Sequence, residues 1–134
     1  MEMFNESQEE KSAPISFDAR QLRAKLLIGW LNNVSMASAN NDYKSWYQSL
    51  RTLYFLCSPY VNKSQSEAVK VQLQKTKNVF DLLVNRRNVS QSIIDTSFTK
   101  STDLVLSTFK DQFMMTHKEE GIEFNANTFD GGVD

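Results

Sequence analysis

Apolar residues recur at intervals of three and four positions along most of this chain, with polar residues between them. Because an α-helix turns once every 3.6 residues, such spacing gathers side chains on one side of a helix. The first run predicts a helix that begins near Asp18, where Asp18 and Gln21 have capping-box spacing. Its expected buried side consists of Leu22, Leu26, Leu27, Trp30, Leu31, Val34 and Ala37. Gly29 within it indicates either close approach of a neighbouring backbone or a tolerated cost.

The second run predicts a helix that is unusually rich in aromatic residues. Asn40 or Asn41 is expected to cap it, and Pro59 disfavours helical geometry at the preceding residue and so ends it. Its expected buried stripe is Tyr43, Trp46, Tyr47, Leu50, Leu53, Tyr54 and Cys57. The connection to the first helix is so short that the two helices should pack as an antiparallel pair.

The remaining periodic segments predict further helices. Ser64 and Glu67 have capping-box spacing at the start of a third helix, whose apolar stripe is Val69, Leu73, Thr76, Phe80 and Leu83. The polar stretch at 85–90 ends this pattern. The helical period resumes at Ile94, Phe98, Val105, Phe109 and Phe113, with Ser101, Thr102 and Asp103 as candidate internal caps. This pattern does not distinguish one helix from two over residues 90–118.

Composition agrees with helices as the main elements. The 134 residues include only four glycines and two prolines, whereas many short strands would each need turn-forming residues. Hydrophobic residues make up 40%, which is enough for one core. We therefore expect an all-α, single-domain bundle of about four amphipathic helices over residues 16–118. Flexible acidic tails are expected at 1–15 and 119–134.

The net charge of −1 conceals a strong segregation of charge. Residues 1–12 have a net charge of −3 and residues 119–134 one of −5, which leaves +7 for residues 13–118. Basic side chains gather on the third helix and just after it, namely Lys63, Lys70, Lys77, Arg86 and Arg87. The three lysines are seven residues apart and so follow one helix face. This face is either simply solvated or a docking surface for nucleic-acid phosphates or an acidic protein.

The second helix carries more large side chains than a single stripe can bury. Phe55 and Leu56 lie off that stripe, so they either pack against a further helix of the chain or form an exposed apolar patch. Exposed patches that contain tryptophan and tyrosine are typical of protein contacts. Trp46, Phe55, Leu56 and Tyr60 are therefore the candidate residues of a protein interface.

No cluster of residues indicates catalysis, a metal or a cofactor. The chain has one histidine, His117, and one cysteine, Cys57, and it lacks the glycine-rich loops that hold phosphate. We expect no enzyme activity, no bound cofactor and no small-molecule substrate. The acidic start is unlike a signal peptide, and no apolar run is long enough for a membrane span. A soluble protein of the cytoplasm, without membrane contact, is expected.

Residues 17–60 resemble small helical proteins encoded by tailed phages. The resemblance rests on LLIGWLNN in the first helix, the Asn-Asn-Asp break and YKSWYQSLRTLY in the second. It implies a phage accessory or virion-associated protein, but it includes no motif with a known activity. We therefore expect a non-enzymatic interaction or assembly protein that binds a protein partner or a second copy of itself. The alternative is a nucleic-acid-binding accessory protein that uses the basic helix face.

Overall fold

A computed structural model describes residues 17–119, which form five α-helices and one short 3-10 helix. The elements are α2 (Phe17–Ala39), α3 (Tyr43–Cys57), η1 (Ser58–Tyr60), α4 (Lys63–Val84), α5 (Gln91–Thr108) and α6 (Lys110–Glu119). This part of the chain contains no β-strand, so the predicted all-α class is confirmed. The predicted tail at 1–15 and residues 120–134 of the other tail lie outside the described residues.

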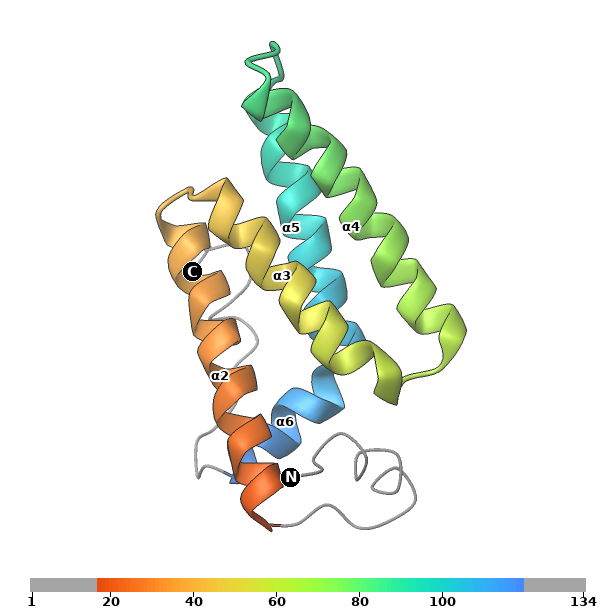
Figure 1. The fold of residues 1–134 in the computed structure, drawn as a ribbon. Helices are drawn as coiled ribbons and strands as arrows, with labels where there is room; N and C mark the ends of the chain where they lie inside the picture. Colours follow the sequence, from red (N-terminus) through yellow and green to blue (C-terminus); the bar gives the residue numbers. More distant parts are fainter. Residues whose placement is uncertain (1–16, 120–134) are drawn as a thin grey trace, which may run out of the picture.

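The helices form two antiparallel pairs and a final short helix (Figure 1). α2 packs along α3, and α4 packs along α5. α3 is the central element, because it also contacts α4 and α5. α6 then turns back against α2, so that helices far apart in the sequence close the bundle.

One hydrophobic core runs through all five helices. α2 contributes Leu27, Leu31 and Val34, and the largest completely buried side chains of the described residues are Phe98 of α5, Phe109 between α5 and α6, and Phe113 of α6. The predicted stripe of α2 was wrong at two positions, because the side chains of Leu22 and Leu26 are 71% and 46% exposed. α2 carries apolar residues on more than one side, so spacing alone could not select the side that is buried.

Two of the predicted helix starts were also wrong, each by a residue or two. Asp42 caps α3 with a carboxylate that accepts a hydrogen bond from the Ser45 amide, whereas Asn41 takes a left-handed conformation with φ of 54°. Asn62, and not Ser64, caps α4 by accepting from the Gln65 amide. Asp and Asn are among the strongest N-caps, and each lies three residues before its donor.

The segment from residue 90 to residue 118 forms two helices. The break is at Phe109, whose φ of −104° and ψ of 17° end α5 before α6 begins at Lys110. Ser101 and Thr102 are buried within α5 and are not helix caps, which corrects the prediction for them. No backbone of the described fold packs closely against Gly29, since a Cβ placed there meets nothing within 4 Å.

Candidate interaction surfaces

Trp46 belongs to the core and does not form part of an exposed interface, contrary to the prediction. Its side chain is 3% exposed and lies 5.0 Å, centroid to centroid, from the ring of Phe98. The indole Nε1–H donates to Thr102 Oγ1 at 2.8 Å, and Thr102 Oγ1–H donates to the Phe98 carbonyl. A buried indole N–H needs such an acceptor. Trp46 therefore fixes the position of α3 on α5.

The other aromatic candidates remain accessible at the carboxyl end of α3. The side chains of Phe55 and Tyr60 are 57% and 61% exposed, whereas Leu56 is half-buried against the core. An arginine lies over each exposed ring: the guanidinium carbon is 4.9 Å from the ring centroid for Arg51 on Phe55, and 4.8 Å for Arg23 on Tyr60. We call these four side chains the aromatic–arginine pairs. Such contacts restrict the orientation of exposed rings.

Arg23 of α2 contacts three other elements at this end of the molecule, namely α3, α6 and, through the ring of Tyr60, η1. It extends from α2 and donates to the Leu56 carbonyl at 3.2 Å and to Gln112 Oε1 of α6 at 2.7 Å. Gln112 Nε2 in turn donates to the Cys57 carbonyl. Both carbonyls belong to the last turn of α3, which has no basic residue of its own. A cation from another helix thus interacts with the negative end of α3.

Sequence reasoning did not identify the two arginines as part of this surface. Arg51 precedes Phe55 by four residues, a spacing that brings side chains together on a helix and so was visible in the sequence. Arg23 and Tyr60 come from different elements, and nothing in their spacing indicates contact. Only the packing of α2 on α3 brings this second pair together.

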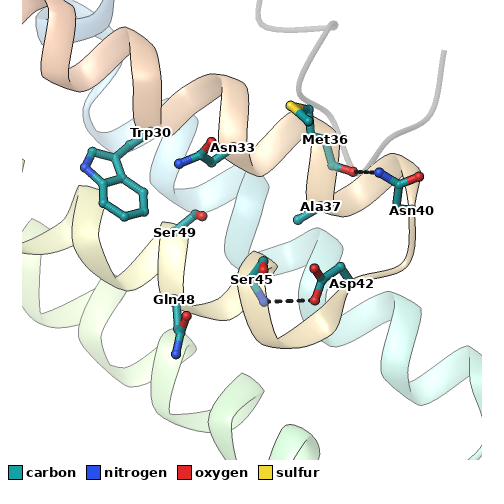
Figure 2. A pocket seen from close by; sticks show the side chains of 9 residues that line it. All are labelled: Trp30, Asn33, Met36, Ala37, Asn40, Asp42, Ser45, Gln48 and Ser49. Atoms are coloured by element: carbon teal, nitrogen blue, oxygen red, sulfur yellow. Dashed lines mark hydrogen bonds between the residues drawn. The ribbon is translucent and has the colours of Figure 1, made fainter.

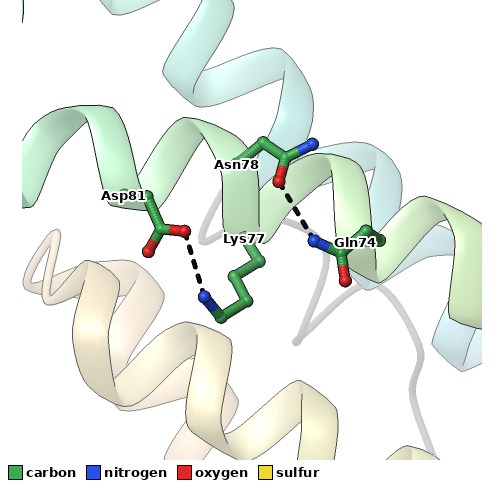
Figure 3. A network of polar contacts seen from close by, with 4 residues as sticks. All are labelled: Gln74, Lys77, Asn78 and Asp81. Carbon is green, nitrogen blue, oxygen red and sulfur yellow. Dashed lines mark hydrogen bonds and ion pairs between the residues drawn. The ribbon is translucent and has the colours of Figure 1, made fainter.

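Only two of the three lysines in the predicted row on α4 are free of an ion pair with a described residue. Lys63 and Lys70 are exposed, but Lys77 Nζ lies 3.0 Å from Asp81 Oδ2, one turn further along the helix (Figure 3). Neighbouring Gln74 and Asn78 pair in the same i,i+4 way. The row therefore carries less net positive charge than three free lysines would.

Arg86 and Arg87 lie beyond the end of α4 and not along its face. Both are exposed in the connection to α5, at the tip of the α4–α5 pair (Figure 1). Arg86 has a φ of 58°, the left-handed conformation that commonly follows a helix end. The predicted basic residues thus divide into a helix face and a separate hairpin tip.

A hollow lies between α2 and α3 next to their connection (Figure 2). It has a volume of about 310 Å³, with Trp30 at one end and mainly polar side chains elsewhere. Two of its polar groups are already engaged: Asn40 Nδ2 donates to the Met36 carbonyl, and Asp42 accepts from Ser45. These two hydrogen bonds stabilise the ends of α2 and α3 where the chain turns.

Cys57 lies in the core, and burial raises the pKa of its thiol to about 11, partly offset by nearby Arg23. A thiol with this pKa is almost wholly protonated at neutral pH and is a poor nucleophile. His117 falls in α6, where its side chain lies outside the described ones. Among the side chains that are described, no three His, Cys, Asp or Glu residues come together as a metal site.

None of the helices within residues 17–119 combines the length and apolar character needed to cross a membrane. Two features of the described residues stand out as candidate binding surfaces. They are the aromatic–arginine pairs and the basic residues of α4 and the hairpin tip. Comparison with known proteins adds no relative: no family model matches the chain, and neither a curated protein nor a solved structure is similar to it.

Proposed function

We propose that this chain is a non-enzymatic helical interaction or assembly protein that uses the aromatic–arginine pairs as its binding surface. The observation that carries the proposal is the exposure of Phe55 and Tyr60, each held beneath an arginine. Tyrosine and arginine are frequent among residues that dominate binding energy. Rings that are already oriented lose less conformational entropy on binding.

The arrangement of Arg23 supports the same proposal. Its guanidinium is held by the Leu56 carbonyl and Gln112, so it positions Tyr60 from a fixed point of the bundle. The resemblance of residues 17–60 to small phage proteins leads us to propose an accessory or virion-associated role. The protein would then act in the host cytoplasm or in the virion, on a protein partner or a second copy.

Sedimentation velocity over a range of concentrations tests self-association, and affinity capture from a lysate of the source cells tests binding to a different protein. Phe55→Ser and Tyr60→Ser should each weaken whichever association is found by about tenfold or more, as for truncation of a dominant interface residue. Val84→Ser is the matched control, because Val84 is 60% exposed on another helix. A strictly monomeric protein that captures no partner would contradict the proposal, as would equal losses with the control.

The second candidate is a nucleic-acid-binding accessory protein. It is supported by the exposure of Lys63 and Lys70 on α4 and of Arg86 and Arg87 at the hairpin tip. Binding to a labelled duplex and to a single strand should weaken steeply as salt concentration rises, because phosphate contacts release counterions. Lys70→Glu together with Lys77→Glu should reduce the affinity. Unchanged affinity in this double variant would exclude the face of α4 as the binding surface.

A further inference from the structure

A second hollow, of about 280 Å³, lies in the groove between α4 and α5. Gln72 and Lys75 line it from α4, and Lys100 lines it from α5. Positions 75 and 77 are separated by about 200° around a helix. The groove therefore opens on a different side of α4 from the row of Lys63, Lys70 and Lys77.

The charged side chains that line this groove are both positive. Lys75 and Lys100 are exposed, and neither forms an ion pair with another residue of the described chain. Lys77 differs in this respect, because it is paired with Asp81. Among the described residues no carboxylate lines the groove, and Asp95 of α5 accepts from Gln91 instead. Two unpaired ammonium groups beside one hollow favour an anionic ligand.

Hydroxyl groups from α5 complete the lining, contributed by Ser92, Thr96 and Ser97. Some helical hydroxyls donate to a backbone carbonyl three or four residues earlier, as those of Thr102 and Ser107 do. Within residues 17–119, the three hydroxyls of the groove make no such bond. They are free to donate to a ligand.

Taken together, these groups lead us to infer that the α4–α5 groove binds a small phosphate monoester. A phosphate monoester has three terminal oxygens, enough to accept from two lysines and from hydroxyls together. The side chain of Ile93 also lines the groove and is 54% exposed, so it offers an apolar contact to the carbon part of the ester. This site is independent of the aromatic–arginine pairs and adds a ligand to the proposed function.

NMR titration of the full chain with phenyl phosphate, inorganic phosphate and benzoate tests the site. Phenyl phosphate should bind saturably and shift the amides of residues 72–75 and 92–100. Inorganic phosphate should bind more weakly because it cannot contact Ile93, and benzoate should not saturate. Lys75→Gln or Lys100→Gln should weaken phenyl phosphate binding by about tenfold, the usual effect of losing one charge-assisted hydrogen bond.

Lys63→Gln is the matched control, because it removes the same charge from α4 outside the groove. It should leave binding unchanged, and an equal loss there would overturn the inference by showing non-specific attraction. Ile93→Ser should abolish the preference for phenyl phosphate over inorganic phosphate. Absence of saturation in the unmodified protein would overturn the site. So would tighter, Lys75-dependent binding of a thymidine decanucleotide, which would make nucleic acid the ligand.

Discussion

At the scale of single residues, polar groups within the core join specific pairs of helices. Trp46 bonds to Thr102, and Thr76 Oγ1 lies 2.6 Å from Ser101 Oγ and donates to the Ser97 carbonyl at 2.9 Å. The first contact joins α3 to α5, and the second joins α4 to α5. Buried polar groups are costly unless they are paired, so each bond disfavours alternative packings of these helices.

Replacement of Thr102 by valine should destabilise the protein even though the two side chains have similar shapes. The variant leaves the Trp46 N–H buried without an acceptor, which costs about 1–3 kcal/mol in the free energy of unfolding. Urea unfolding measures this loss. Thr102→Ser keeps the acceptor and should be more stable than the valine variant, whereas equal stability of the two would show that the bond contributes little.

The buried thiol of Cys57 should make stability fall at alkaline pH. The unfolded thiol ionises near its ordinary pKa of 9.0 and the folded one near about 11, so above pH 9 the unfolded state loses its proton first. The contribution of this thiol to the free energy of unfolding is fully present below pH 9. It declines as pH rises from 9 through 11, and the loss is about 2 kcal/mol at pH 10.5. Urea unfolding of the parent and Cys57→Ala at pH 8 and 10.5 measures it. An equal decline in the parent and in Cys57→Ala would show that other titrating groups cause the loss of stability.

At the scale of helices, periodicity predicted which segments are helical but not their ends or their buried sides. The stripes of α3 and α4 were predicted correctly for Leu50, Leu53, Val69 and Leu73, which are buried. The buried side of α2 was partly wrong, because Leu22 and Leu26 repeat with helical spacing but α2 meets its neighbours elsewhere. Exposure of Phe55 also depended on tertiary packing. Local spacing does not contain that information.

Capping of α3 by Asp42 should be sensitive to acid. Its hydrogen bonds with Ser45 hold the pKa of the carboxyl below its ordinary value of 3.8. The stabilising contribution is therefore present above pH 4 and is lost as pH falls through the lowered pKa. Asp42→Ala should lower the melting temperature at pH 7. Asp42→Asn keeps an acceptor that does not titrate, so its melting temperature should fall less in acid than that of the parent. An equal fall in the two proteins would show that other groups cause the acid sensitivity.

At the scale of the whole molecule, α6 closes the bundle by packing on α2. Phe113 of α6 is completely buried, and Gln112 beside it bonds to Arg23 of α2 and to the end of α3. These contacts arise because the chain breaks at Phe109 and changes direction. A single continuous helix over residues 91–119 would carry Phe113 away from α2.

Truncation of Phe113 should therefore destabilise the whole bundle and not α6 alone. Phe113→Ala removes a buried ring, for which about 3–5 kcal/mol is typical. Chemical unfolding followed by both circular dichroism and tryptophan fluorescence should show one transition at lower denaturant. Met115→Ala is the control, since Met115 is 71% exposed in the same helix and should change stability little. Separate transitions would show that α6 folds as an independent unit.

The pairing of α2 with α6 also has a consequence during synthesis on the ribosome. Arg23 and Gln112 are separated by 89 residues, so α2 emerges long before its final partner. At typical elongation rates of 5–20 residues per second, this delay lasts roughly 4 to 18 seconds. Throughout that interval the side of α2 that α6 will cover faces water. The nascent chain is thus exposed to chaperones and to premature contact with other chains until α6 is made.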